Sequence, residues 1–118
     1  MMADENTIEK LIRVLESFAY PVKRIAYRPK KDEHIPETYI TLRLLQAVPC
    51  EYCDDDYERL LYTFSIIITT KKDYVSLLAE IIDLLRSEGY TIAEIESEVI
   101  DVETGNFYIP ITIKALEE

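Results

Sequence analysis

Cys50 and Cys53 are separated by two residues, a spacing with which two thiolates can chelate zinc or cycle between dithiol and disulfide. A zinc site takes about four ligands, and those left to complete one are His34 and an aspartate from residues 54–56. Such a mixture of soft and hard ligands is seldom used in structural zinc sites. A redox pair favours a helix N-terminus, whereas Pro49 and the aspartates mark an acidic loop. We therefore interpret the two cysteines as incidental loop residues.

The acidic loop itself offers oxygen ligands of the kind that Mg²⁺ and Ca²⁺ prefer, because Asp54, Asp55 and Asp56 lie between Glu51 and Glu58. The spacing of an EF-hand and its glycine are absent. We interpret this loop as solvated or facing a partner, and we expect no bound metal. A metal-dependent hydrolase, in which these aspartates act together with the histidine of the preceding loop, is the weakest of the alternatives.

Other enzyme classes lack the residues that they need. Gly89 and Gly105 are the only glycines, so no glycine-rich loop can hold a phosphate group, which excludes nucleotide-dependent enzymes. His34 is not accompanied by a nucleophile-elbow motif. The sequence therefore predicts a protein that is not an enzyme, with no catalytic residues and no cofactor.

The net charge is strongly negative. Among 118 residues, 13 are Lys or Arg and 23 are Asp or Glu, which gives a formal charge of −10. A chain this acidic repels phosphate, so we expect no stationary or sequence-specific binding of DNA or RNA. No apolar run approaches the roughly 20 residues of a membrane-spanning helix, so we expect no membrane partner.

One basic cluster interrupts this acidity, and acidic residues follow it directly. We interpret it as a charged flank that can dock on an acidic neighbouring subunit. Its members are Lys23, Arg24, Arg28, Lys30 and Lys31.

The first half of the chain predicts one helix and three strands. Helical spacing of apolar residues covers residues 7–20, where Asn6 and Glu9 form a capping box and Pro21 ends the helix. A short strand over residues 22–27 and a charged loop over 28–38 follow. Residues 39–48 and 60–69 then alternate as strands. The residues expected on the helix-facing side are Ile40, Leu42, Leu44, Val48, Leu60, Tyr62, Phe64, Ile66 and Ile68.

The second half predicts a helix and two strands. The helix is capped by Asp73 and ends at Gly89, and its wide apolar face predicts a deep position. Residues 90–102 indicate one irregular edge strand, with an acidic outer row of three glutamates and with apolar residues opposite. A turn over residues 103–106 leads to the last strand, 107–116. Pro110 in that strand predicts an edge position or a bulge.

The predicted order is α-β-β-β-α-β-β, which indicates an α+β fold. We expect a single α+β domain over residues 1–118, with two helices packed on one face of a mainly antiparallel four- to five-stranded sheet.

The sheet face without helices is the surface that this fold leaves unexplained. A face in water alternates cleanly between apolar and polar residues, whereas this one carries a mixture of aliphatic and threonine side chains. We therefore predict a partner surface. The alternative is that single exposed apolar residues are normal on a protein surface. The residues in question are Thr41, Leu45, Leu61, Thr63, Ser65, Ile67, Thr69, Tyr108 and Thr112.

A series of short stretches between residues 21 and 113 resembles the tail terminator family of tailed phages and prophages, also called tail-completion or head-to-tail joining proteins. Their order and spacing carry the resemblance. The stretches are Pro36-Glu37-Thr38-Tyr39-Ile40, Pro49 with Glu51-Tyr52-Cys53-Asp54-Asp55, Tyr62, Lys72-Asp73-Tyr74 with Leu77, Gly89-Tyr90, and Glu103-Thr104-Gly105 with Tyr108.

The resemblance implies a non-enzymatic virion structural protein, a tail terminator or head-tail connector component. It implies a homo-oligomeric ring, expected to be hexameric, that is assembled in the host bacterial cytoplasm, contacts tail-tube and head-connector proteins and lets DNA pass. A small ligand-binding or regulatory α+β domain is the alternative. The residues expected at interfaces are Lys30, Lys31, Tyr52, Asp54, Asp55, Asp56, Leu61, Thr63 and Ile67.

Overall fold

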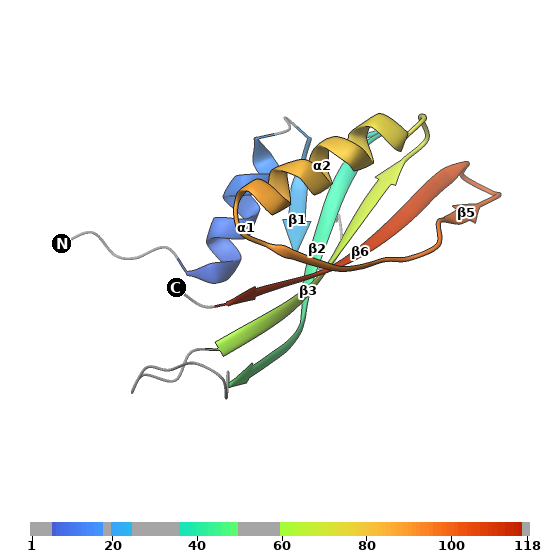
Figure 1. Cartoon of the computed structure of the whole chain (residues 1–118). Coiled ribbons are helices and arrows are strands. Elements are labelled where there is room, and N and C mark those ends of the chain that lie inside the picture. Colours follow the sequence, from blue (N-terminus) through green and yellow to red (C-terminus); the bar gives the residue numbers. More distant parts are fainter. Residues whose placement is uncertain (1–5, 18–19, 25–35, 50–59, 117–118) are drawn as a thin grey trace, which may run out of the picture.

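The computed structural model describes residues 6–17, 20–24, 36–49 and 60–116. These residues form two helices and six strands, which Figure 1 shows in chain order. The elements are α1 (Thr7–Glu16), β1 (Val22–Arg24), β2 (Tyr39–Pro49), β3 (Leu60–Thr70), α2 (Val75–Ser87), β4 (Thr91–Ile95), β5 (Val99–Asp101) and β6 (Asn106–Leu116).

The six strands form one sheet in the order β1-β2-β3-β6-β4, and β5 pairs with β6 beyond the end of β4. Only the β1–β2 pair is parallel among the described strands. Both helices lie on the same side of this sheet (Figure 1). The predicted α+β class and the mainly antiparallel sheet are confirmed, whereas the expected strand number of four to five is wrong because residues 90–102 form two strands.

Pro110 explains that break, and its predicted edge position is wrong. β6 is an interior strand, paired with β3 on one side and with β4 and β5 on the other. The Pro110 carbonyl accepts a hydrogen bond from the Glu96 N–H (2.9 Å), so the missing N–H of the proline faces the same side, in the gap between β4 and β5. The ladder with β3 loses nothing. The irregularity in β4 is a register shift between Ile92 and Glu94, away from the proline.

The core lies between the helices and one face of the sheet. Both helices contribute to it, and the alternating residues of β2, β3 and β6 supply most of it, as the sequence predicted. This inner face carries almost no exposed surface. Its fully buried large side chains are Leu11, Leu15, Ile40, Leu42, Phe64, Ile66, Ile68, Ile81, Leu85, Ile109, Ile111 and Ile113.

A bulge in β2 changes which face its last residues join. Leu44 pairs with Phe64, but Gln46 pairs with Thr63, so Leu45 is the extra residue. A shift of one residue moves every following side chain to the opposite face. Val48, which we expected on the helix side, therefore pairs with Leu61 and lies on the uncovered face.

The first helix begins as predicted and ends earlier. The Glu9 N–H donates to Asn6 Oδ1 (2.8 Å), and the Asn6 amide donates to the Glu9 carboxylate (2.8 Å). The helix ends at Glu16 with Ser17 as its C-cap, before the predicted end at residue 20.

The second helix begins one residue later than predicted. Tyr74 is its N-cap, and the Asp73 carboxylate accepts the hydrogen bond of the Val75 N–H (3.0 Å). Gly89, at a φ of 93°, closes the helix in a Schellman motif, with the Tyr90 N–H donating to the Leu85 carbonyl. The helix is less deep than its apolar face predicted, because two of its residues are buried and Val75 is 65% exposed.

No helix among the described residues is long and apolar enough to cross a membrane.

Candidate functional site

The uncovered side of the sheet, here called the outer face, is the largest candidate surface. The strand register sets its rows: Thr41, Ile67 and Pro110 lie side by side, and so do Tyr39, Thr69 and Tyr108. The predicted interface residues Leu61, Thr63 and Ile67 all belong to this face, on β3, and all are half-buried. The remaining members on β2 and β6 include Arg43, Gln46, Val48, Thr112, Lys114 and Leu116.

Charge is missing from the middle of the outer face. The central strand β3 has no charged residue, and its outer side chains are aliphatic or hydroxyl-bearing. Charged side chains enter only from the flanking strands, such as Arg43 on β2, Lys114 on β6 and Glu94 on β4. An antiparallel sheet that faces water normally carries polar residues on that face, so this composition favours contact with another surface.

A hollow of about 280 Å³ lies on the outer face where β2, β3 and β6 meet the segment after β4. Its charged side chains are Arg43 and Glu96, one of each sign. The residues that line it are Thr41, Leu42, Arg43, Leu45, Ser65, Ile67, Glu96 and Thr112. The bulge residue Leu45, 46% exposed, forms part of its wall.

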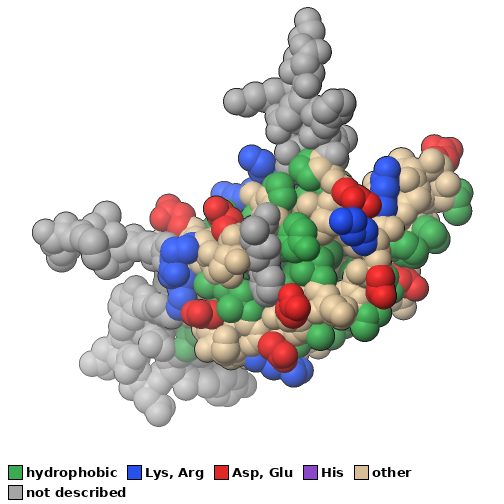
Figure 2. All heavy atoms as spheres, turned by 90° about the horizontal axis from the view of Figure 1, so that it is seen from above, with side chains coloured by type: hydrophobic (Ala, Val, Ile, Leu, Met, Phe, Trp, Pro, Cys, Tyr) green, Lys and Arg blue, Asp and Glu red, His purple; other side chains and the backbone are tan. Residues whose placement is uncertain are grey.

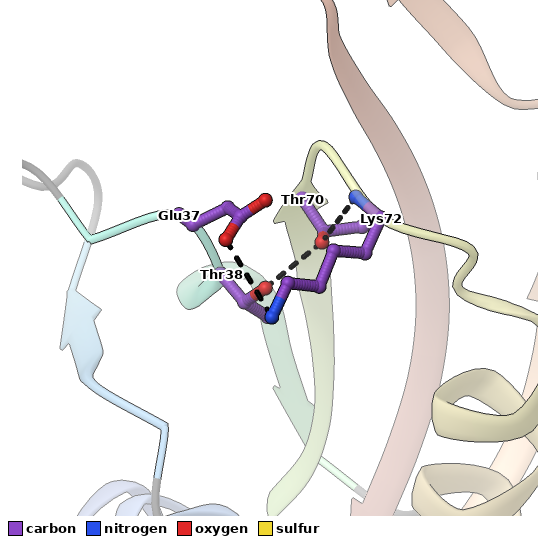
Figure 3. Close-up of polar contacts among 4 residues, drawn as sticks. All are labelled: Glu37, Thr38, Thr70 and Lys72. Carbon is purple, nitrogen blue, oxygen red and sulfur yellow. Dashed lines mark hydrogen bonds and ion pairs between the residues drawn. The ribbon is translucent and has the colours of Figure 1, made fainter.

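A polar network joins the start of β2 to the end of β3 (Figure 3). The buried Thr38 and Thr70 hydroxyls share a hydrogen bond of 2.8 Å, and the Lys72 N–H donates to Thr70 Oγ1 (3.1 Å). The Lys72 ammonium lies 3.5 Å from the Glu37 carboxylate, and both side chains are exposed. These contacts fix the two strand ends to each other.

This end of the sheet brings together several stretches that carried the family resemblance. Residues 36–40 and 72–74 meet in the network of Figure 3, and Tyr108 lies opposite Thr69 in the next strand. The Tyr74 ring lies against Phe107 (5.7 Å between centroids), and its hydroxyl donates to the Glu98 carboxylate. The Gly89-Tyr90 stretch does not join them, because it lies at the other end of α2.

The β4–β5 edge is a surface that sequence reasoning placed wrongly. We expected the apolar residues of this segment to be covered, but Ile95 and Val99 are 45% and 56% exposed. Ile100 and Val102 are also exposed, and hydrophobic side chains extend to the right-hand end of Figure 2, where β5 lies in Figure 1. The alternation of these residues with glutamates was the available signal, but it does not tell which row of an edge strand is covered.

Several predicted site residues lie outside the described residues. This applies to the acidic loop, the cysteine pair, the histidine and two of the predicted basic residues, whose interpretation therefore stays a prediction. They are Lys30, Lys31, His34, Cys50, Tyr52, Cys53, Asp54, Asp55 and Asp56. Within the described residues, no group of three or more His, Cys, Asp or Glu side chains is placed to hold a metal ion.

Comparison with known proteins found no protein-family model that matches the chain and no significant match among curated proteins.

Proposed function

We propose that this protein is a non-enzymatic structural component of a tailed phage or prophage: a tail terminator or head-tail connector protein that forms an oligomeric ring at the end of the tail tube. The observation that carries the proposal is the outer face of the sheet, whose central strand has no charge and no helix over it. Such a face is suited to contact with protein, because burying uncharged side chains carries no penalty for desolvating charge.

The outer face supplies the proposed subunit contacts. Leu61, Thr63 and Ile67 are half-buried within one chain, so each has further surface to bury against a partner. A stable interface needs about 800 Å² on each partner. The twenty or so residues that such an area takes can be drawn from the three long strands β2, β3 and β6 together with the sheet edges.

The residues outside the described part of the chain keep their predicted roles in this proposal. Lys30 and Lys31 belong to the subunit contact, and Tyr52 with the aspartates 54–56 faces a neighbour, a partner ring or the channel. The formal charge of −10 fits a channel through which DNA moves, because attraction to phosphate would hold the genome in place.

The family resemblance adds a second line of support. The stretches around Thr38 and Lys72 are 34 positions apart in the sequence, yet they meet through the shared hydroxyl hydrogen bond and the ion pair of Figure 3. Part of the resemblance thus has a physical basis in how two strand ends are joined.

Electron microscopy of tail tubes tests the proposal. Purified tubes are incubated with the chain carrying a terminal gold-binding tag, and we expect label at one end of each tube. Label distributed along the tubes, or absent from them, would contradict the proposal. A neighbourhood of portal, tail-tube and tape-measure genes around the gene for this chain is the corresponding genomic expectation.

A small ligand-binding domain is the second candidate, and the hollow beside Arg43 and Glu96 favours it. Its volume of about 280 Å³ is close to the lower end of typical ligand sites, roughly 300–1,000 Å³. Opposite charges at its walls suit an amino acid or another small zwitterion. Calorimetry with a panel of amino acids tests this function; heat that disappears in the Arg43→Met variant would support it, and absence of heat would reject it.

A metal-dependent hydrolase is the third candidate, and it depends on residues that the structure does not describe. Calorimetry with Zn²⁺, Mg²⁺ and Mn²⁺ that gives no heat would remove it.

A further inference from the structure

The two edges of the sheet carry opposite charge. At the β4–β5 edge, Glu94, Glu96 and Glu98 are all exposed, and we call these three residues the acidic edge. They are interleaved with the exposed apolar residues Ile95 and Val99.

The opposite edge of the sheet is basic. Lys23 and Arg24 are exposed on β1, and Arg43 is exposed on β2 next to it; we call these three residues the basic edge. In the described part of the chain, strand pairing on this side of β2 ends at Leu42, so Arg43 lies just beyond the end of β1. The two edges are separated by the full width of the sheet, because β1 is first and β4 is last in the strand order.

We propose that copies of this chain associate head-to-tail, with the acidic edge of one copy docked against the basic edge of the next. The occupant of each edge is a second copy of the same chain, and the argument for it is the match of three exposed acidic residues to three exposed basic residues. The exposed Ile95 and Val99 supply apolar area beside the acidic edge. This inference rests on the proposed ring and names the surfaces that build it.

The geometry of the sheet decides what kind of assembly such a contact builds. Two different surfaces meet, so the contact is heterologous and leaves one edge of each kind free at the ends of any open chain of copies. Repetition then closes a ring or extends a filament. Contact between two identical acidic edges would bring six glutamates together and is disfavoured, since like charges across an interface cost several kcal/mol.

Two charge-reversal variants test the contact. The first carries Glu94→Lys and Glu96→Lys, and the second carries Lys23→Glu and Arg24→Glu. Glu98 is left unchanged because its carboxylate accepts the hydrogen bond of Tyr74. The matched control carries Glu80→Lys and Asp83→Lys, which reverse two exposed charges on α2 away from both edges.

Sedimentation velocity, with and without tail-tube protein, measures the association of each variant. We expect each edge variant alone to associate at least about tenfold more weakly than the unchanged chain, because each places like charges at the contact. An equimolar mixture of the two edge variants restores association, since each basic surface then meets an acidic one. The control variant associates like the unchanged chain.

The outcomes separate the failure of this inference from failure of the proposed function. Association of the unchanged chain that neither edge variant weakens would overturn the head-to-tail contact and leave the ring standing on the outer face. Loss of association in only one of the two variants, with no recovery in the mixture, would also overturn it. An unchanged chain that stays monomeric even with tail-tube protein would overturn both proposals.

Misfolding of a variant does not obscure the result. Recovery of association in the mixture requires both edge variants to be folded, and far-ultraviolet circular dichroism of each checks this independently. A chain that carries all four substitutions has its edges exchanged in charge, so we expect it to associate with itself; failure of this folded chain to associate would also count against the contact.

Discussion

The two faces of the sheet are built from the same strands, yet they differ in what covers them. On β3, Phe64, Ile66 and Ile68 face the helices and are fully buried, whereas Ser65 and Ile67 face outward and are half-buried. Neighbouring residues of one strand therefore have different tasks. The inner residues hold the fold together, and the outer residues are available for contact with other molecules, which allows the two tasks to be separated by substitution.

Phe64→Ala is expected to have the largest effect on stability. Phe64 is fully buried and its ring stacks on Tyr62 (5.9 Å between centroids). Truncation removes the buried ring and leaves a cavity, so we expect the free energy of unfolding to fall by about 3–5 kcal/mol. Urea denaturation measures this loss. A change below about 1 kcal/mol would show that the inner face is not the core.

The pair Ile66→Ala and Ile67→Ala compares the two faces at adjacent positions. We expect Ile66→Ala to lower the free energy of unfolding by about 2–5 kcal/mol, because the side chain is fully buried. The half-buried Ile67 has less area to lose, so Ile67→Ala is expected to cost below about 1.5 kcal/mol and to weaken self-association instead. Urea denaturation and sedimentation measure the two effects. Equal losses of stability would contradict the division between the faces.

The hydroxyl pair Thr38–Thr70 tests a polar contact at the end of the inner face. Its two oxygens are 2.8 Å apart and both residues are buried. A double-mutant cycle with Thr38→Val and Thr70→Val is expected to give a coupling energy of about 0.5–1.5 kcal/mol. Zero coupling would show that the hydrogen bond does not fasten the two strands.

Lys72→Ala is expected to have the smallest effect. Lys72 and Glu37 pair at 3.5 Å with side chains that are 70% and 50% exposed, so solvent and salt screen the attraction. We expect a loss below about 0.5 kcal/mol, measured by urea denaturation at low salt, and a still smaller loss at high salt. A larger loss that salt does not reduce would point to a packing role for the lysine stem.

Much of the local structure could be predicted because it follows from neighbours in the sequence. The inner rows of β3 and β6, the cap formed by Asn6 and the positive φ of Gly89 and Gly105 were all predicted from spacing or residue type, and the structure confirms them. The bulge at Leu45 was not predicted, because periodicity alone does not show where a strand gains a residue. As a result, Val48 was assigned to the wrong face.

Long-range order could not be predicted in the same way. No local signal shows that β6 lies between β3 and β4, so Pro110 was taken to indicate an edge strand, although its missing donor affects only one of its two neighbours. The outer face of β3 was predicted as a candidate surface, since alternation alone defines it. The pairing of an acidic edge with a basic edge required the strand order, and hence the structure.

Native mass spectrometry of the intact chain, alone and after incubation with tail-tube protein, tests the central claim of self-association most directly. We expect one closed assembly whose mass is a fixed multiple of the 13.8 kDa chain, six copies if the ring is hexameric. A chain that remains at 13.8 kDa under both conditions would contradict the claim.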